Sequence, residues 1–599
     1  MKVGKMQKFQ NSREQEKLRD TEPGGLQNRS DSQKLRDIGS PAGLQDIREA
    51  VQKTAYPERI LQFGTGNFLR GFADWMIEKA NRAGVMQSSV VICQPTASAR
   101  GKALNAQNGL YTVISRGTGK CAGADTGECA GENNSAGAGE CVGEGTGAGV
   151  GEETEAEIIT CISRCISPYE DYDAWMELAG SGDLEIIISN TTEAGISYHA
   201  GDRLRDRPPV SFPAKLSAFL YERFCRLQGS PEAGLLILPC ELIERNGQVL
   251  QKLVYRYAEE WGLPGDFLRW TGQHCVFCET LVDRIVPGYP AEEEQELWQR
   301  FGYRDRCMVA AEEDYLWVIG VPEGCRPEEL QERFPLHKAG LNVQWVRDAA
   351  PYRQRKVRIL NGAHTGLALA GVLSGIRTVR EMMENPVFSE RFDRLVYGEI
   401  IPAAAGRILP EEELREFADM TKKRFLNPYL RHRLLDISLN SCAKVRARLL
   451  PSLLDWYSLP GQNSTPQELC RAFAAFLRFY RVRQRKMPMP DGSEADSVAS
   501  FGPGSTARSA ATDRPVSAAR LIVYEGTDFA GNTYEVKDEA ARLARFAVIW
   551  AGAEALPDPE QAAFFVTDRV LADKDLWEMD LTELPGFREA VGKLLQKMV

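Results

Sequence analysis

The stretch ILQFGTGNFLRGF, from Ile60 to Phe72, decides how the N-terminal half of this 599-residue chain is interpreted. A short apolar run is followed by Gly64, one further residue and Gly66, as in the turn of a dinucleotide-binding βαβ unit. The first glycine of such a turn allows a tight bend, and the second lets the backbone approach a pyrophosphate. The third glycine of the fingerprint is replaced by Leu69. The motif alone therefore leaves a nucleotide site and an ordinary strand–turn–helix corner equally open.

The sequence around this turn has the order of elements that a dinucleotide site requires. Apolar side chains recur every fourth residue from Phe68 to Ala80, which predicts one helix from Gly66 to a stop at Gly84. The amino end of that helix would offer free N–H groups and a favourable dipole to a phosphate. A second apolar run, SSVVICQ, follows, but it ends in Gln94 where an acid would bind the ribose.

Two patterns divide the rest of the chain into halves. Short β-rich runs, among them LYTVISR, EIIISN, LLILPCELI and DYLWVIG, alternate with helical stretches, which predicts a mostly parallel sheet. From about residue 346 onward, apolar residues recur at spacings of three and four, which predicts helices. We therefore expect an α/β N-terminal Rossmann-type domain over residues 56–345 and a mainly α-helical C-terminal domain over residues 346–599. A ligand cleft is expected between them.

Three segments have compositions that do not fit a packed core. Residues 1–55 are polar with weak periodicity, and we expect a flexible N-terminal extension. Residues 117–156 are low in complexity, rich in glycine and acidic, and residues 487–516 are rich in Pro, Ser and Ala. Both are predicted to be loop insertions, because such compositions cannot bury enough apolar surface to offset the entropy of ordering.

Composition excludes several classes of function. Hydrophobic residues make up 43% and charged residues 26% at a net charge of -10, and no basic stripe alternates with aromatics, so no nucleic-acid partner is expected. No run approaches the roughly 18–20 apolar residues of a membrane span, and the first residues lack the apolar segment of a secretory signal. We expect a cytoplasmic protein without a membrane partner. Cys275 and Cys278 form a lone CxxC, and no metal site is expected.

A second candidate site lies in KVRILNGAHTGLALAGVL, which begins at Lys356. Lys356, Asn361 and His364 would share one broad face of a continuous helix, which turns about 100° per residue. A lysine that is desolvated in a cleft can act as a general acid or base near neutral pH. An asparagine can donate a hydrogen bond to a carbonyl oxygen that gains charge. Each residue also has an ordinary interpretation, as a solvated charge, a turn residue or a core histidine.

Six stretches, in the same order along the chain, resemble the polyol-specific long-chain dehydrogenases, a family that includes mannitol dehydrogenases and hexuronate reductases. They are GTGNFLRGF, LPCELIERNG, VDRIVPG, YLWVIG, KVRILNGAHT and RFLNPYLRHRLLDISLNSCAKVRARLLP. The resemblance covers about residues 56–480 and 517–599, without the insertion at 117–156, and three of the stretches are more similar to the hexuronate branch. It implies a Rossmann-type domain, a helical domain and a substrate bound between them.

The resemblance makes Leu69 an ordinary feature of a nucleotide turn, because the family's pattern is GxGxFxR[GA]F. The segment SNTTEAGI, from Ser189 to Ile196, follows a predicted strand and is expected to line the nicotinamide pocket, with an ordinary βα loop as the alternative. The candidate residues for binding NAD are Gly64, Gly66, Asn67, Phe68, Arg70, Thr192 and Glu193.

The family's KxxxxNxxH motif falls on Lys356, Asn361 and His364. It implies that the lysine is the general acid–base catalyst, that the asparagine polarises the reacting oxygen and that the histidine orients a substrate hydroxyl. Asn246 is the best match to a second polarising asparagine. The family's RFxNP motif implies that Arg424 contacts the substrate, with Asn427 nearby. Mannitol dehydrogenases have an acid just before the lysine, at a position suited to proton relay, and the preceding PYRQR lacks one.

The resemblance implies NADH-dependent, reversible hydride transfer to the ketone of a small hexuronate. The choice of NAD over NADP rests on the resemblance alone, since Gln94 carries no charge to repel a 2′-phosphate. Arg424 is one candidate cation for the substrate carboxylate, and no metal is required. A reductase for another ketohexuronate, a mannitol-type polyol dehydrogenase and an inactive binding or scaffold homologue remain alternatives.

Overall fold

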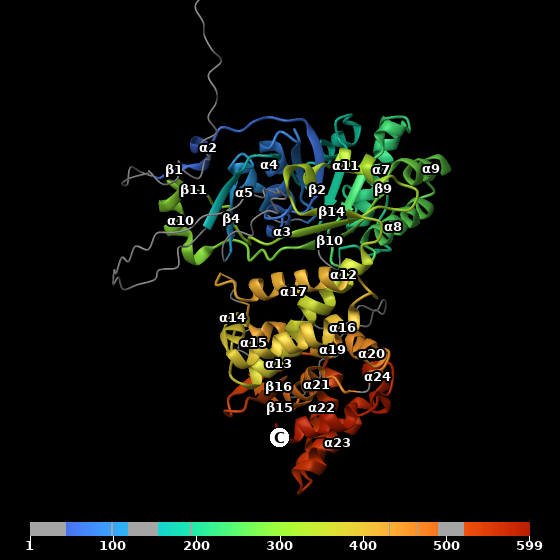
Figure 1. The fold of residues 1–599 in the computed structure, drawn as a ribbon. Coiled ribbons are helices and arrows are strands. Elements are labelled where there is room, and N and C mark those ends of the chain that lie inside the picture. The colour runs from blue at the N-terminus through green and yellow to red at the C-terminus, as the bar shows by residue number, and fades with distance from the viewer. Residues whose placement is uncertain are drawn as a thin grey trace, which may run out of the picture.

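The chain folds into an α/β half and a helical half. The α/β half holds the parallel sheets, and α12 (Ala350–Lys356) and α17 (Glu411–Phe425) of the helical half lie against it (Figure 1). The predicted fold class is therefore confirmed. The computed structural model describes residues 44–96, 100–117, 154–191, 195–429, 432–462, 464–488 and 520–599.

A six-stranded parallel sheet with the order β6-β3-β2-β7-β8-β9 forms the centre of the α/β half. Its inner strands are apolar runs, as expected for parallel strands that are covered on both faces. The strand order reverses between β2 and β7, so a ligand crevice is expected at the carboxyl ends of these two strands. The strands are β2 (Glu58–Phe63), β3 (Ser89–Cys93), β6 (Ile162–Ile166), β7 (Ile186–Ser189), β8 (Leu236–Pro239) and β9 (Val276–Phe277).

Helices cover both faces of this sheet, and alternate strand residues pack into two separate clusters. Ile60 and Ile188 point toward the face covered by α4, whereas Leu61 and Ile187 point toward α7 and α8. The alternation follows from the twofold period of a strand. The helices are α4 (Ala73–Arg82), α5 (Arg100–Ala106), α6 (Tyr172–Glu177), α7 (Phe212–Arg226), α8 (Asn246–Glu260) and α9 (Gly265–His274).

Two smaller sheets adjoin the main one, and they contain two runs that we expected in the main sheet. LYTVISR forms β4 and DYLWVIG forms β13, in sheets of order β12-β4-β5 and β10-β13-β14. That prediction was wrong because β4 pairs with β12, far along the chain, and strand alternation does not reveal such pairing. The strands are β4 (Tyr111–Arg116), β5 (Thr154–Ile159), β10 (Glu279–Asp283), β12 (Val309–Glu312), β13 (Leu316–Gly320) and β14 (Val343–Val346).

Parts of the expected extension and insertions belong to the fold. β1 (Gln45–Asp46) pairs with β11 (Tyr303–Arg304), and α2 (Ile47–Ala50) follows, with Ile47 fully buried among apolar residues. The predicted flexible extension therefore ends before residue 56. Residues 154–156 begin β5, and β15 (Arg483–Pro488) includes residues 487 and 488. Most of the two predicted insertions, and residues 1–43, lie outside the described residues.

The helical half buries a large apolar core around α13 (Gly362–Leu373), every residue of which is buried. A three-stranded antiparallel sheet that we did not predict, formed by β15, β16 (Arg520–Thr527) and β17 (Thr533–Glu535), packs on this core. The other helices are α14 (Val379–Glu384), α15 (Pro386–Leu395), α16 (Ile401–Ala404), α18 (Leu434–Ile437), α19 (Ser441–Arg448), α20 (Leu450–Tyr457), α21 (Gln467–Phe479), α22 (Ala540–Glu554), α23 (Pro559–Leu571), α24 (Lys574–Trp577) and α25 (Phe587–Gln596).

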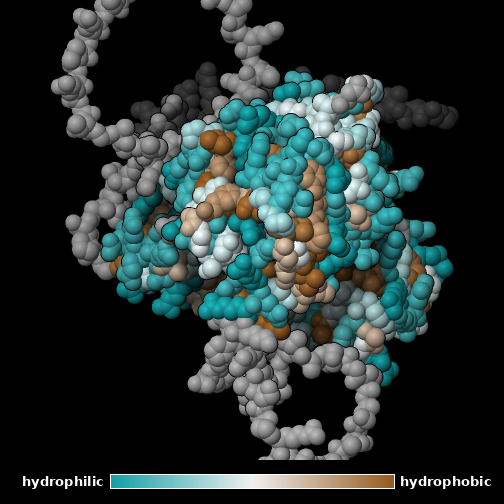
Figure 2. Space-filling model, turned by 90° about the horizontal axis from the view of Figure 1, so that it is seen from below, coloured by the Kyte–Doolittle hydropathy of each residue, from teal (hydrophilic) through white to brown (hydrophobic). Residues whose placement is uncertain are grey.

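The surface seen from the helical end is mainly hydrophilic, with apolar residues in narrow patches (Figure 2). Within the described ranges, no helix is both long enough and apolar enough to cross a membrane. The same ranges contain no group of three or more His, Cys, Asp or Glu side chains arranged to hold a metal ion.

Candidate active site

The glycine turn lies at the point where the strand order reverses. Gly64 follows β2 with φ +132°, and its N–H donates to the carbonyl of Cys93 at the end of β3 (3.1 Å). A Cβ at this position would lie 2.9 Å from the carbonyl oxygen of Asn190, so only glycine fits. Gly66 precedes α3 (Asn67–Arg70), and a Cβ there would meet nothing within 4 Å. The turn therefore leaves open space beside the backbone, as a dinucleotide phosphate requires.

The helix after the turn is interrupted, which corrects the prediction of one helix from Gly66 to Gly84. α3 ends at Arg70, and α4 begins at Ala73. The break includes Gly71, which packs closely, because a Cβ there would lie 3.1 Å from both Val286 and Val309. Leu69 is buried and packs beside the turn, and Gly84 ends the helical segment with φ +70° as expected.

Two of the candidate cofactor residues use their side chains inside the protein. Arg70 is buried and donates to the carbonyl of Cys307 and to the Oδ1 of Asn67, both at 2.6 Å. Phe68 instead lines a cavity beside the turn. The structure thus leaves the backbone of the turn and the ring of Phe68 facing the crevice, whereas Arg70 holds α3 in place.

The segment after β7 reaches the same crevice through a residue that we did not select. Asn190 lines the cavity, its backbone N–H donates to Phe63 (3.1 Å), and its side-chain Nδ2 donates to the carbonyl of Cys240 (2.8 Å). Its position directly after β7, at the strand reversal, was the signal that could have identified it. The two residues that we did select, Thr192 and Glu193, lie outside the described residues.

Glu241, just after β8, fixes the residues that follow β7 through hydrogen bonds to its side chain. Its buried carboxylate accepts hydrogen bonds from the Ser189 hydroxyl (3.0 Å), the Thr191 N–H (3.0 Å) and the Thr191 hydroxyl (2.9 Å). Burial raises the pKa of Glu241, and the hydrogen bonds from Thr191 and Ser189 oppose that rise. The carboxylate therefore fixes the backbone on either side of Asn190.

Lys356 reaches this crevice from the helical half. It lines a cavity of about 340 Å³, and we call this the lysine cavity. Its Nζ donates to the carbonyl of Val282 (2.9 Å) and lies 3.2 Å from the Oδ1 of Asp283. The lining residues are Phe68, Asn190, Glu241, Leu242, Val282, Arg284 and Lys356. The nucleotide turn and the predicted catalytic lysine thus meet in one cavity between the two halves.

A buried ion network holds Lys356 in place. Arg424 donates to Asp283 (2.9 and 3.1 Å) and to Glu312 (2.7 and 3.1 Å), and all three are buried. Burial alone would raise the pKa of Asp283, but the charges of Lys356 and Arg424 hold it well below its usual value. Asp283 is therefore ionised beside the lysine, although the sequence before Lys356 contains no acid. We did not select it, although it stands in the VDRIVPG stretch.

Arg424 and Asn427, expected at the substrate, instead connect the two halves of the protein. Four N–H groups of Arg424 are directed to Asp283 and Glu312, so the guanidinium has little capacity left for a substrate carboxylate. Asn427 donates to the carbonyl of Arg116 (3.1 Å) and accepts from the N–H of Tyr429 (3.0 Å). These contacts support the lysine site from positions that do not line the lysine cavity.

The helix from Lys356 to His364 is not a regular α-helix. α12 continues into a π-helical segment, η5 (Val357–Asn361), before α13 begins. A π turn closes between residues five apart, so Lys356 and Asn361 come nearly above one another. Regular α-helical spacing, from which we expected a shared face, therefore does not apply to this pair. The π turn aligns them better than an α-helix would, and π turns are frequent at functional sites.

His364 is buried in a small apolar cavity next to the ion network. Its ring stacks on Phe425 with the centroids 4.0 Å apart, and His432 lies edge-on at 5.1 Å. The Nε2 of His364 has no hydrogen-bond partner among the described residues. Burial, reinforced by His432, lowers the pKa of His364 well below its usual value, so the imidazole is neutral near pH 7.

The neutral state of His364 predicts a pH dependence of stability. The unfolded chain takes up a proton on this imidazole below about pH 6.5, whereas the folded protein excludes it, so stability falls as the pH decreases from that value. The loss reaches at most about 1.4 kcal/mol per pH unit. We expect His364→Asn to reduce the drop in melting temperature between pH 7 and pH 5, and the exposed His199→Asn not to. An equal drop in melting temperature in wild type and His364→Asn would contradict the conclusion that the folded protein keeps His364 neutral.

Asn246 does not fit the role expected for it. Its side chain is fully buried, and Nδ2 donates to the carbonyls of Pro239 (2.8 Å), Glu241 (3.1 Å) and Thr280 (3.1 Å). Its Oδ1 accepts from the N–H groups of Gly247 and Thr280. Every polar atom of the amide is used to join β8, α8 and β10, so none is left for a substrate oxygen.

The residue after β3, where an acid would bind the ribose, is also used in contacts within the protein. Gln94 is buried; its Oε1 accepts from the N–H of Gly101 and its Nε2 donates to the carbonyl of Thr96, both at 2.8 Å. The amide thus shapes the connection between β3 and α5. It supplies neither the acid that a ribose 2′-hydroxyl would bind nor a repelling charge.

Comparison with known proteins agrees with this geometry. Family models match over residues 147–328, as a mannitol dehydrogenase Rossmann domain, and over residues 348–491, as a mannitol dehydrogenase C-terminal domain. The chain belongs to the mannitol dehydrogenase family and is an oxidoreductase of the nicotinamide-dependent type. The first match begins after the glycine turn, which the structure nevertheless places in the same sheet.

Its curated relatives include altronate oxidoreductases. That of Pectobacterium carotovorum is 38% identical over 544 residues, which is 91% of this chain and 95% of the relative. That of Klebsiella pneumoniae is 39% identical over 536 residues, or 90% and 93% of the two chains. One from Escherichia coli is 38% identical over 547 residues, or 91% and 95%.

Two solved structures share the fold at lower identity. Pseudomonas fluorescens mannitol 2-dehydrogenase, in a ternary complex with NAD and D-mannitol, has a TM-score of 0.57 at 18% identity and covers 92% of this chain and 93% of its own. Substrate-free D-sorbitol dehydrogenase has a TM-score of 0.64 at 17% identity and covers 93% and 98%.

Proposed function

We propose that the protein catalyses the NADH-dependent reduction of D-tagaturonate to D-altronate, and the reverse reaction, in hexuronate catabolism. The observation that carries the proposal is the lysine cavity, in which Lys356 meets Asn190 and Phe68 beside the nucleotide turn. The altronate oxidoreductases among the relatives, similar over nearly their whole length, support the substrate class. The nicotinamide of a bound dinucleotide would supply the hydride, and the open space at Gly66 fits the pyrophosphate of that dinucleotide.

Lys356 is proposed to act as the general acid in the reduction. As the ketone carbon gains a hydride, its oxygen becomes an alkoxide, and the ammonium of Lys356 gives it a proton. Asp283 orients the lysine and compensates its charge. In the reverse direction, the neutral amine takes the proton from the hydroxyl. The buried surroundings strengthen each of these interactions relative to water.

Two asparagines are proposed to stabilise the developing alkoxide. Asn361 follows Lys356 by one π turn and comes from the helical half. Asn190 comes from the α/β half and takes the role expected for Asn246. Preformed amide donors cost little reorganisation when the charge appears. His364 is neutral, and its Nε2 has no partner within the described part of the chain, so it suits a hydrogen bond to a substrate hydroxyl.

The proposal is tested by a panel of substrates and cofactors. Tagaturonate, fructuronate and fructose are compared by kcat/KM, each with NADH and with NADPH, and we expect tagaturonate with NADH to give the highest value. A preference for fructuronate or fructose would identify a fructuronate reductase or a mannitol-type dehydrogenase. Absence of NADH binding in a fluorescence titration would point to an inactive homologue. Either result would overturn the proposed substrate or activity.

A substitution at Glu241 tests the support beneath Asn190. In Glu241→Gln, one acceptor oxygen becomes an NH₂ group that cannot accept from Thr191 or Ser189. This lowers the free energy of unfolding by about 1–3 kcal/mol. We expect a lower melting temperature and weaker NADH binding, measured by scanning fluorimetry and fluorescence titration. The exposed Glu244→Gln is the control. NADH affinity equal to that of the control would contradict the role of Glu241.

A further inference from the structure

A hexuronate carries a carboxylate, yet two arginines next to Lys356 in the described part of the chain, Arg424 and Arg284, are already engaged. Four N–H groups of Arg424 are bound to Asp283 and Glu312. Arg284, in the lysine cavity, donates Nε to the Glu312 carbonyl, and its two terminal nitrogens contact the Gly71 carbonyl and the Ser115 hydroxyl. A carboxylate receptor must therefore be sought elsewhere along the boundary between the two halves.

A second and larger cavity adjoins this region from the other side of the ion network. It has a volume of about 500 Å³, and we call it the outer cavity. β4, β12 and residues 285–293 form its α/β side, and Pro428, Tyr429 and His432 close it from the helical half. It shares Ile285 and His432 with the small cavity that contains His364 and Arg424.

Arg116 is the arginine that lines the outer cavity. It ends β4 and is the strand neighbour of Glu312, and its side chain is only 11% exposed. Two of its nitrogens donate to the two oxygens of Glu293, at 2.9 and 2.6 Å, while its Nε has no partner among the described residues. Its guanidinium also lies over the ring of Tyr429, 5.4 Å from the centroid.

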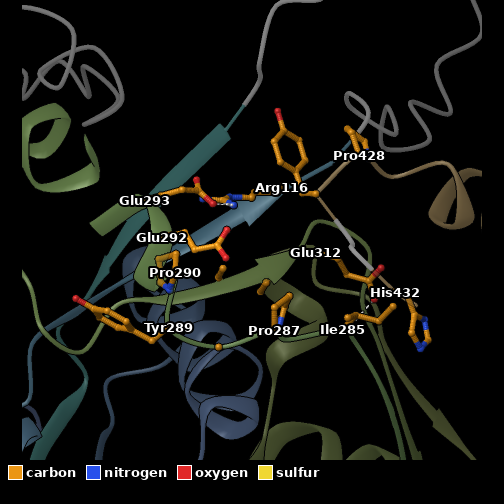
Figure 3. Close-up of a pocket in the computed structure, with 14 residues that line it drawn as sticks. Arg116, Ile285, Pro287, Tyr289, Pro290, Glu292, Glu293, Glu312, Pro428 and His432 are labelled. Carbon is orange, nitrogen blue, oxygen red and sulfur yellow. Dashed lines mark hydrogen bonds and ion pairs between the residues drawn. The ribbon is translucent and has the colours of Figure 1, made fainter. Parts of the chain in front are cut away.

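The partner of Arg116 is a carboxylate that can be exchanged. Glu293 belongs to a short 3₁₀ turn at the surface, and its side chain is 47% exposed. Figure 3 shows Glu293 against Arg116 at one end of the outer cavity and Glu312 near His432 at the other. An ion pair with so exposed a partner contributes little stability, so another carboxylate can replace it. Glu312 does not repel that carboxylate strongly, because Arg424 balances its charge.

We propose that Arg116 binds the carboxylate of the hexuronate substrate, with Glu293 occupying the same position until the substrate displaces it. The inference rests on the proposed function. Bidentate binding of a planar carboxylate is the geometry that a guanidinium favours, and Glu293 already demonstrates it here. Arg116 thereby distinguishes sugar acids from neutral ketoses, and the outer cavity is the side from which the acid enters.

Arg116→Gln tests the receptor directly. We expect KM for tagaturonate to rise about tenfold to a hundredfold, the range for loss of a charged hydrogen-bonded pair, with the NADH dissociation constant unchanged. Arg116→Lys, which keeps the charge but not the two-point geometry, is expected to raise KM by a smaller factor. Arg164→Gln is the matched control, because Arg164 binds Glu58 through two contacts of 2.9 Å away from the outer cavity.

Glu293→Gln separates a substrate receptor from a structural ion pair. Removing the competing carboxylate is expected to lower KM for tagaturonate about twofold to fivefold. A structural pair would instead give an unchanged or raised KM in both Glu293→Gln and Arg116→Gln, and that pattern would overturn the proposal. So would a KM for Arg116→Gln within twofold of the Arg164→Gln control.

Binding of altronate, measured by calorimetry in the presence of NAD, separates this proposal from the proposed function. Binding by the wild type that is lost in Arg116→Gln supports the receptor even without turnover. Turnover of tagaturonate with unchanged affinities in Arg116→Gln overturns the receptor alone. A wild type that neither reduces tagaturonate nor binds altronate overturns both. Melting temperatures within a few degrees of wild type verify that the variants are folded.

Discussion

Lys356→Ala is expected to lower kcat for ketone reduction by about a hundredfold to ten-thousandfold, the usual contribution of a positioned general acid. The alkoxide would then have to take its proton from water in a cavity that Phe68 and Leu242 partly close. NADH binding is expected to be retained, because the nucleotide turn belongs to the other half of the protein. Steady-state kinetics across pH and a fluorescence titration with NADH measure the two effects separately.

Two controls sharpen this result. Lys338→Ala removes an exposed lysine paired with Glu332 and is expected to leave kcat unchanged. Small primary amines added to Lys356→Ala are expected to restore part of the rate, because they can deliver the missing proton. Turnover by Lys356→Ala equal to that of the wild type would remove the lysine from the mechanism.

The second large effect is expected at Arg424. Arg424→Met leaves Glu312 buried without its arginine and leaves Asp283 with Lys356 alone, and breaking a buried ion pair in this way costs about 3–5 kcal/mol. We expect the apparent free energy of unfolding, measured by denaturant titration, to fall by this amount. Activity is expected to fall as well, because Asp283 loses its two hydrogen bonds from Arg424 and then positions Lys356 less firmly.

A control residue lies on the same helix as Arg424, outside the ion network. Arg415→Met changes an exposed arginine on the same helix, and is expected to alter stability by no more than about 0.5 kcal/mol. Adding Asp283→Asn and Glu312→Gln to Arg424→Met removes the uncompensated charges and is expected to recover much of the lost stability. A loss below about 1 kcal/mol in Arg424→Met would show that the network contributes little to holding the two halves together.

Local patterns were sufficient to predict the fold class and part of the site. The strand, the two glycines and the periodic apolar residues after them predict a nucleotide turn because all of its parts are neighbours in sequence. Leu69 was one apparent defect beside Gln94, and its side chain packs beside the turn where a third glycine would stand. Lys356 could be proposed because its motif lies on a single helical segment.

Long-range contacts account for what the sequence did not predict. Asp283, which contacts Lys356, ends β10 in one of the smaller sheets. Asn190 lines the lysine cavity from the end of β7 in the main sheet. The link between Asp283 and Lys356 has no spacing that a motif could reveal, whereas the place of Asn190 directly after a predicted strand was an available signal. Asn246 was assigned wrongly because a match of residue type does not say whether a side chain faces a cavity or the interior. Gly71, at the break, packs against residues more than 200 positions later in the chain.

The central claim is direct hydride transfer to a hexuronate ketone in the lysine cavity. It is tested most directly with NADH that carries deuterium on the transferable position of the nicotinamide. The purified protein and tagaturonate are incubated with this cofactor, and the product is analysed by NMR and mass spectrometry. The account predicts altronate with one deuterium on the former ketone carbon. Altronate without deuterium, or no altronate at all, would contradict it.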